Sequence, residues 1–331
     1  MRKKVQIFMF KFLLICPYFG KLPGCFQLWL DSCKYNKNLN FLVLTDDKTQ
    51  YRIPSNVKII YMEFKQIQNL IHKKFAFVTY DIKPYKLCDY KPTYGYLFSD
   101  FISGYDYWGN CDLDLIYGDL ARFLPIQTYD KISNLGHTTF YRNNSVINTA
   151  FMKYSKNTLT YKDILASDAN FGFDEIGDYG IKKIFNRNGY SVYPLEKDIA
   201  DISPNNSNLK LSHYDPIKEC FFQDENDSII SFERGHIFSW NFMANGEIKK
   251  KELAYVHFQK RRMEDYRSQK HSEYFLIGPH GFYDYQKVTR ELFAYFHGWD
   301  IDRELLYRKF KALKNRLKRE ATIRKLMKGR K

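Results

Sequence analysis

Two aspartates separated by one residue, Asp112 and Asp114, are the strongest candidates for chemistry in this chain. They follow an aromatic run that is typical of a buried strand. Alternate side chains of an extended segment share one face, so both carboxylates would project together from the end of that strand. Two close carboxylates repel each other unless a cation lies between them, and oxygen ligands suit Mg²⁺ or Mn²⁺. The alternative is a surface turn with two solvated acids.

His257 is a second candidate, because it ends an apolar strand pattern and is followed by Lys260 and Arg261. A histidine beside cations predicts a metal ligand next to a phosphate site. The alternative is a hydrogen-bonded core or surface histidine, which is the more common use of a single histidine.

The apolar side chains of residues 87–101 recur every three or four positions, which predicts a helix. This segment also contains charged residues. Pro92 predicts a helix start or a kink there. Lys91 would then lie near the positive end of the helix dipole, where a bound anion is favoured and a lone cation is not. Lys91 and Asp89 are therefore candidates for contacting a diphosphate or a sugar, unless they are exposed charges on a solvated face.

Asp174 and Glu175 are candidates on the later half of the chain. They open a segment that reads as a helix extending through Phe185. Acids in a first helical turn often only complement the dipole, but they also serve in acceptor binding or as a general base.

The elements that must position these residues alternate between strands and helices. Strands are expected at Lys4–Cys16, Phe41–Leu44 and Val57–Met62, and helices at 26–33 and Glu63–Phe75. This order predicts an α/β fold with a mostly parallel sheet and ligands at the carboxyl ends of its strands. The loops Pro17–Gly24 and Thr45–Asp47 fall at those ends, although no GxGxxG or Walker A motif is present.

The later part of the chain is expected to be richer in β structure. Residues 201–212 are polar and turn-rich, which predicts a loop. The strand patterns Ile237–Phe242 and Leu253–Phe258 flank Asn245-Gly246, a strong hairpin signal.

Composition limits the class of protein. With 331 residues, 18% aromatic and 44% hydrophobic, the chain can bury one large core or two modest ones. Its six cysteines form no Cys-X-X-Cys pair, which favours free thiols in a reducing compartment. The apolar N-terminus is interrupted by Gln6 and Lys11, so we expect a first strand and a cytoplasmic protein, soluble or peripheral on the inner face of the membrane.

The net charge of +15 is concentrated at the C-terminus, where residues 301–331 hold thirteen Lys/Arg and three Asp/Glu. Leu306, Phe310, Leu313 and Leu317 would line one face of a basic helix. Such a helix is typical of docking on an anionic membrane. A solvated terminal helix is the alternative. Nucleic acid is not an expected partner, because no reading module accompanies the charge.

Several of these stretches together resemble GT-A-fold nucleotide-sugar glycosyltransferases, most closely bacterial enzymes of lipopolysaccharide, capsule and related surface glycan synthesis. The resemblance covers roughly residues 4–285 and lies in CPYFGKLP, KLCDYKPTYGYLF, GNCDLDLIYGD and YVHFQKR. One departure is the lack of a Gly-Lys-Pro-Trp type ending after His257. The resemblance implies a GT-A type, Rossmann-like sheet flanked by helices, with a late hairpin region and a basic C-terminal helix.

The resemblance also implies boundaries and roles. A transferase domain at 1–290 would divide into a donor half at 1–125 and an acceptor half at 126–290, followed by a tail at 291–331. Asp112, Asp114 and His257 would bind Mn²⁺ or Mg²⁺, and Asp174 and Glu175 would act on the acceptor side. The donor-binding residues would be Pro17, Tyr18, Phe19, Asp46, Asp89, Lys91, Asp112, Lys260 and Arg261.

The expected function is metal-dependent transfer of a sugar from a nucleotide-diphosphate donor, with UDP as the expected nucleotide, to a glycan or lipid-linked acceptor. Two alternatives compete with it. One is a sugar-phosphate nucleotidyltransferase, which also uses paired carboxylates and Mg²⁺. The other is a non-catalytic, basic adaptor that binds a membrane or a nucleic acid.

Overall fold

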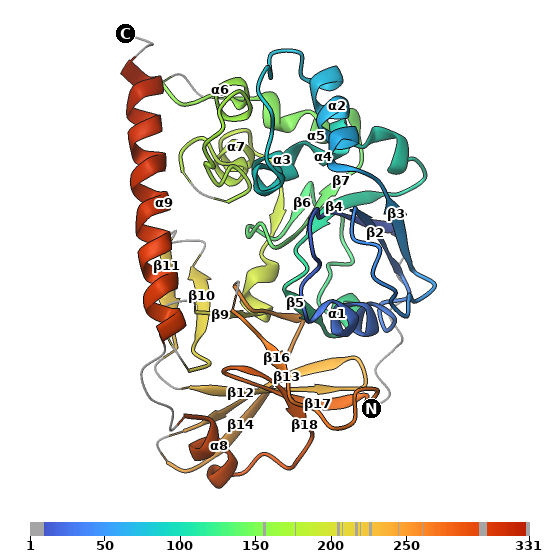
Figure 1. The fold of residues 1–331 in the computed structure, drawn as a ribbon, viewed down its shortest axis with the longest axis vertical. Coiled ribbons are helices and arrows are strands. Elements are labelled where there is room, and N and C mark those ends of the chain that lie inside the picture. Colours follow the sequence, from blue (N-terminus) through green and yellow to red (C-terminus); the bar gives the residue numbers. More distant parts are fainter. Residues whose placement is uncertain are drawn as a thin grey trace.

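The computed structural model describes residues 10–328, apart from 155–156, 176, 204–205, 207, 216–217, 219, 225–226, 244, 260 and 298–302. Its described part is an α/β protein with three sheets. A seven-stranded sheet lies among the helices of the upper body, a six-stranded sheet forms the opposite end, and a long helix runs along one side (Figure 1).

The seven-stranded sheet is mixed, so the prediction of a mostly parallel fold was too simple. β1, β2, β3 and β4 pair in parallel, but β7 is antiparallel to both β4 and β6. The apolar run of β1 is buried on both faces of this sheet, as expected of a central parallel strand. Its strands, in spatial order, are β3 (Val57–Tyr61), β2 (Leu39–Thr45), β1 (Phe12–Pro17), β4 (Tyr107–Cys111), β7 (Thr138–Arg142), β6 (Lys131–Ile132) and β8 (Val192–Tyr193).

Short helices cover this sheet. The helix predicted over 87–101 is instead broken at Pro92, which lies in a 3₁₀ turn and has no N–H to donate within a helix. A side chain at Gly95 would overlap the ring of Trp108, so the segment packs closely on the sheet. The α-helices are α1 (Phe26–Cys33), α2 (Phe64–Lys74), α3 (Leu87–Tyr90), α4 (Tyr94–Leu97), α5 (Ser145–Asn148), α6 (Tyr161–Leu165) and α7 (Ile181–Arg187). The 3₁₀ turns are η1 (Pro84–Lys86), η2 (Lys91–Thr93), η3 (Ser99–Phe101), η4 (Leu120–Arg122), η5 (Ala150–Met152) and η6 (Leu195–Asp198).

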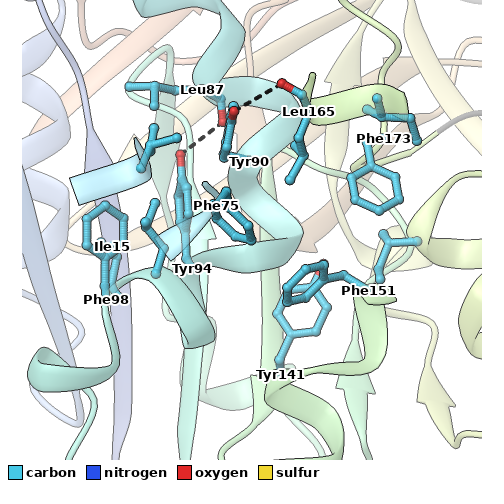
Figure 2. Close-up of a cluster of buried hydrophobic side chains, with 14 of the residues drawn as sticks. Ile15, Phe75, Leu87, Tyr90, Tyr94, Phe98, Tyr141, Phe151, Leu165 and Phe173 are labelled. Atoms are coloured by element: carbon cyan, nitrogen blue, oxygen red, sulfur yellow. Dashed lines mark hydrogen bonds between the residues drawn. The ribbon is translucent and has the colours of Figure 1, made fainter. Parts of the chain in front are cut away.

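An aromatic core holds the broken helices against the sheet (Figure 2). The hydroxyl of Tyr94 donates to the carbonyl of Leu87 at 3.1 Å, and that of Tyr90 donates to the carbonyl of Leu165 at 3.3 Å. Buried tyrosines keep such partners because an unpaired hydroxyl in a core is costly. This core therefore fixes the 87–101 segment although it lacks a continuous helix.

A five-stranded sheet joins distant parts of the chain. Its strands, in spatial order, are β11 (Cys220–Gln223), β10 (Leu211–Asp215), β9 (Ala200–Ile202), β15 (Tyr255–His257) and β5 (Leu115–Tyr117). The loop predicted at 201–212 is thus wrong at both ends, because β9 and β10 pair antiparallel there.

A six-stranded sheet contains the predicted hairpin, whose turn uses Gly246 at φ +84°. The hairpin partner of β13 is β14, not 253–258, because the chain leaves this sheet after Leu253 and enters β15. The strands, in spatial order, are β14 (Ile248–Leu253), β13 (His236–Phe242), β12 (Ser228–Glu233), β17 (Tyr274–Gly278), β18 (Gly281–Asp284) and β16 (Glu264–Asp265). Helix α8 (Arg290–His297) packs on this sheet through Leu292 and Phe296, so it belongs to the body.

Helix α9 (Arg303–Lys328) is the predicted basic C-terminal helix. Ile323, Leu326 and Met327 pack against the aromatic core, and the helix stands along the side of the molecule (Figure 1). Among the described residues, the structure contains no helix with the length and apolar character needed to cross a membrane.

Candidate metal centre

Asp112, Asp114 and His257, which together are called the acidic centre, lie where the strand order of the seven-stranded sheet reverses. β1, β2 and β3 follow one another outward, whereas β4 lies on the other side of β1. Because β1, β2 and β4 are parallel, their carboxyl ends share one edge, where Pro17, Asp46 and Asp112 lie at or just after the strand ends. The crevice outside such a switch point is where α/β sheets bind ligands.

Main-chain pairing places Asp112 beside His137. The ladder between β4 and β7 has Cys111 opposite Thr138. It is extended by one bond, in which the N–H of Asp112 donates to the carbonyl of His137 at 2.9 Å. The position of Asp112 is therefore set by the sheet and not by a flexible turn.

A second ladder places Asp114 beside His257. β5 pairs antiparallel with β15, so that Leu115 lies opposite His257. The N–H of Phe258 then donates to the carbonyl of Asp114 at 2.9 Å. On its other side β15 is parallel to β9, and His257 lies opposite Asp201.

Asp112, Asp114 and His257 form a set with the geometry of a metal centre. One ligand atom from each lies within 4.8 Å of the others. Nε2 of His257 is 3.5 Å from Oδ1 of Asp114, and the side chains of Asp112 and Asp114 are 31% and 25% exposed. Two carboxylates and an imidazole, open on one side, suit a divalent cation that also takes oxygen ligands from a substrate.

Asp201 fixes the orientation of His257. Nδ1 of His257 lies 2.8 Å from Oδ1 of Asp201, and Oδ2 of Asp201 accepts a hydrogen bond from Gln259. Metal-binding histidines characteristically pair their second nitrogen with a carboxylate in this way. Burial alone would lower the pKa of His257, but Asp114 and Asp201 outweigh burial and raise it well above its ordinary value. A bound ion would therefore displace a proton.

Lys91 brings a buried positive charge to the same centre. Its Nζ lies 2.7 Å from Asp112 and 3.2 Å from Asp174, and it donates to the carbonyl of Gly136. Burial opposes the charged form of Lys91, yet the two carboxylates raise its pKa well above the ordinary value. Lys91 is therefore buried among carboxylates and not exposed on a solvated helix face, and its contact with a diphosphate stays a prediction.

Asp174 and Glu175 also reach this centre, but not from a helix. The predicted helix begins only at Ile181, because the preceding chain turns through Gly172 and Gly177 at positive φ. Burial raises the pKa of Asp174 to about 7, although Lys91 lowers it, and burial also raises the pKa of Glu175.

Asp89, which was predicted to contact the donor, is fully buried and bonded within the chain. Its carboxylate pairs with Lys86 at 2.8 Å. It also accepts the N–H groups of Phe171, Gly172 and Phe173. Asp89 therefore holds residues 171–173, which precede Asp174, in place.

The loop after β1 lies beside the acidic centre. The pKa of Tyr18 is raised by burial and by Asp114, which places its hydroxyl in the field of that carboxylate. Phe19 is buried against Phe64, with ring centroids 5.0 Å apart. Asp46 accepts the N–H of Gly20 at 2.7 Å, so this residue shapes the loop.

Of the two predicted diphosphate cations, the structure describes Arg261. Lys260 lies outside the described residues. Arg261 is buried, and its guanidinium donates to the carbonyls of Ser203, Asn208 and Pro279. These hydrogen bonds show that Arg261 stabilises the loop after β9.

Two residues beside the acidic centre, Asp201 and His137, were not predicted from the sequence. Asp201 falls in a stretch that was interpreted as a loop, although the apolar residues Ile199 and Ala200 before it are a weak strand signal. No role was predicted for His137. Its ring stacks on His257 at 4.2 Å between centroids, and burial lowers its pKa well below the ordinary value.

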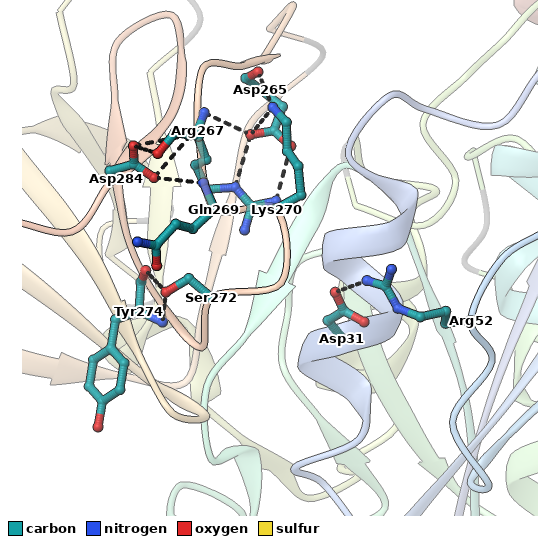
Figure 3. Close-up of polar contacts among 10 residues, drawn as sticks. Asp31, Arg52, Asp265, Arg267, Gln269, Lys270, Ser272, Tyr274 and Asp284 are labelled. Carbon is teal, nitrogen blue, oxygen red and sulfur yellow. Dashed lines mark hydrogen bonds and ion pairs between the residues drawn. The ribbon is translucent and has the colours of Figure 1, made fainter.

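A cavity of about 440 Å³ lies elsewhere, between α1 and the six-stranded sheet. Leu28, Tyr35 and Phe275 are among its lining residues, and its charged groups pair with one another. Asp31 binds Arg52 at 3.2 Å, and Lys34 binds Glu273 at 2.9 Å. Figure 3 shows the Asp31–Arg52 pair facing the 265–274 loop.

The chain matches a family described as a family of unknown function, DUF6625, over residues 14–286. It belongs to this family. None of the curated proteins compared with the chain matches it. The DUF6625 region includes every residue of the acidic centre, and it ends before α8 and α9.

Proposed function

We propose that this protein is a metal-dependent glycosyltransferase with a GT-A-like donor site. The observation that supports the proposal is the convergence of Asp112, Asp114 and His257 at the switch point of the sheet. The proposed donor is a nucleotide-diphosphate sugar, with UDP as the first nucleotide to test. The proposed acceptor is a glycan or lipid-linked glycan of a bacterial surface polysaccharide.

The residues of the centre have complementary roles in this proposal. Asp112, Asp114 and His257 would hold Mn²⁺ or Mg²⁺, which stabilises negative charge on a leaving diphosphate. Lys91 adds a fixed positive charge, held in place by Asp112 and Asp174 before a donor binds. Such preorganised charge needs no rearrangement as the sugar–phosphate bond breaks.

Asp174 would work on the acceptor side. Because burial holds its pKa at about 7, its carboxyl group can accept or hold a proton near neutral pH. That is the range in which a general base is most effective. Glu175 accepts the N–H of Gly136 and so positions Gly136, which lies against both Lys91 and Asp174.

Calorimetry on UDP and GDP, each with and without Mn²⁺, tests the proposal on the wild type and on Asp114→Asn. We expect one nucleotide to bind in a metal-dependent manner and the variant to lose this binding. Asp178→Asn is the control, since this exposed acid belongs to no part of the centre. The absence of metal-dependent nucleotide binding in the wild type would refute the proposal.

Turnover separates the remaining alternatives. A nucleotidyltransferase would consume a sugar phosphate with a nucleoside triphosphate, whereas the proposed enzyme would hydrolyse or transfer only a preformed nucleotide sugar. A basic adaptor would bind vesicles or nucleic acid and show no nucleotide affinity.

We also propose that α9 docks the enzyme on the cytoplasmic side of an anionic membrane. Phe310, Leu313 and Leu317 are 68%, 54% and 57% exposed, and they recur at helical spacing. Lys314 and Lys318 lie between and beside them. Each basic residue near an anionic leaflet contributes about 1 kcal/mol, which adds to burial of the apolar stripe.

Vesicle sedimentation tests this docking. We expect binding to vesicles that contain phosphatidylglycerol but not to pure phosphatidylcholine, and loss of binding in Leu313→Glu/Leu317→Glu. Ile126→Glu is the matched control, because Ile126 is 73% exposed on another part of the surface. Equal binding of all three proteins would contradict the role of α9.

A further inference from the structure

His137 has an unsatisfied nitrogen in the interior of the protein. Its side chain is buried and its Nδ1 lies 2.9 Å from the hydroxyl of Tyr255. Its Nε2 has no hydrogen-bond partner among the described residues. A buried polar atom without a partner is costly and calls for an explanation, such as a ligand that it would bind.

The surroundings of His137 contain two further ligands. One atom each of His137, Asp201 and His257 lies within 4.8 Å of the others, and all three residues are buried. The imidazoles of His137 and His257 stack with an angle of 23° between their planes. Because the nitrogen lone pairs lie in the ring planes, the two rings must rotate out of this stack to bind one ion. The acidic centre also contains His257, together with the partly exposed Asp112 and Asp114. His257 is the residue that the two sets share.

We propose that His137, Asp201 and His257 form a second metal-binding set, suited to zinc, that shares His257 with the acidic centre. Two imidazoles and one carboxylate are the ligands that Zn²⁺ prefers, whereas the oxygen-rich Asp112 and Asp114 favour Mn²⁺ or Mg²⁺. Three protein ligands leave one position of a tetrahedral zinc for water.

Binding in this set has a defined consequence for the hydrogen bonds. Zinc selects the His137 tautomer that donates its Nδ1 proton to the oxygen of Tyr255 and directs the Nε2 lone pair at the ion. The ion would also replace the hydrogen bond between Asp201 and His257, so Nδ1 of His257 must carry no proton when the ion is bound. No oxidation or group transfer is involved.

Occupation of the two sets is expected to be antagonistic. His257 faces Asp201 with Nδ1 and Asp114 with Nε2, so both ions would use one imidazole. Two divalent charges on one small ring repel each other in an interior of low dielectric constant. Zinc would therefore weaken binding of Mn²⁺ at the acidic centre.

Two variants separate the sets. His137→Phe keeps an aromatic ring against His257 but removes a zinc ligand, and Asp112→Asn removes a ligand of the acidic centre only. Zn²⁺ and Mn²⁺ are titrated separately by calorimetry, and Co²⁺ is used as a visible probe of nitrogen ligands. Unfolding temperatures of both variants establish that they are folded, and His137→Gln is a second variant should His137→Phe not fold.

The expected result is a double dissociation. His137→Phe should lose at least tenfold in Zn²⁺ affinity, together with the Co²⁺ absorption bands, and keep its Mn²⁺ affinity. Asp112→Asn should lose Mn²⁺ affinity and keep Zn²⁺. Unchanged Zn²⁺ binding in His137→Phe, or parallel losses of both metals in both variants, would overturn the proposal. No nucleotide or sugar is used, so the outcome is independent of the proposed transferase activity.

Discussion

Oδ1 of Asp201 lies 2.8 Å from Nδ1 of His257, on two parallel strands whose register sets these residues opposite each other. The pair is buried, with 4% of the Asp201 side chain and 10% of the His257 side chain exposed. It directs Nε2 of His257 toward Asp114 and leaves that nitrogen available to a metal ion.

Asp201→Asn should weaken Mn²⁺ binding by about tenfold or more, because loss of a carboxylate behind a metal-binding histidine usually costs 10–100-fold in affinity. Asp224→Asn is a matched control: Asp224 pairs with His213 at 3.0 Å, remote from the acidic centre along the sheet. Electron spin resonance of free Mn²⁺ measures both affinities. Equal affinities in the two variants would show that Asp201 does not orient a metal ligand.

Gly136→Ala should destabilise the fold by about 1–3 kcal/mol through overpacking. A Cβ atom at this position would lie 2.3 Å from Oδ2 of Asp174 and 2.8 Å from its Cγ. Gly24→Ala provides the control, since its added Cβ would meet no atom within 4 Å. Urea unfolding measures both changes, and a Gly136→Ala variant as stable as Gly24→Ala would contradict the packing around Asp174.

The sequence was most informative where local pattern decides the structure. The strand at 41–44 and the helix at 26–33 were predicted because apolar spacing identifies elements whose partners are near in the chain. The same reasoning placed Asp112 at the end of a strand, which the structure bears out.

The sequence was least informative where distant segments pair. The parallel pairing of β9 with β15 joins residues more than fifty positions apart, and no local pattern specifies it. Asp201 was consequently missed. The segment before α7 was misread for a different reason, because Gly177 takes a positive φ that interrupts the helix predicted from Asp174 onward.

Asp174 should make stability depend on pH. Its carboxyl group titrates near 3.9 in an unfolded chain, but burial raises its pKa to about 7 in the fold. Between those values the folded protein binds a proton that the unfolded chain has released, so the contribution of Asp174 to stability is lost as pH rises toward 7.

Asn imitates the protonated form of Asp174, so Asp174→Asn should gain about 2 kcal/mol relative to the wild type between pH 5 and pH 8. Urea unfolding at the two pH values measures the difference. Asp81→Asn is the control, because the Asp81 side chain is 86% exposed. A constant difference between Asp174→Asn and the wild type would mean that Asp174 is ionised throughout this range.

Lys131 should produce a pH dependence of the opposite sign. Its side chain is fully buried, and its Nζ has no hydrogen-bond partner among the described residues. The rings of Tyr141 and Phe185 lie 5.9 and 5.8 Å away, and burial lowers the pKa of Lys131 to about 8. The unfolded chain keeps this proton up to about pH 10.4, so the wild type should gain stability as pH rises from 8.

Lys131→Met removes the buried charge and keeps most of the side-chain volume. The variant should therefore be more stable than the wild type at pH 7, and this advantage should shrink by about 2 kcal/mol by pH 9.5. Lys58→Met is the control, because Lys58 is exposed on β3. Thermal or urea unfolding at both pH values measures the difference. A Lys131→Met variant less stable than the wild type at pH 7 would indicate that the ammonium group has a stabilising partner in solution.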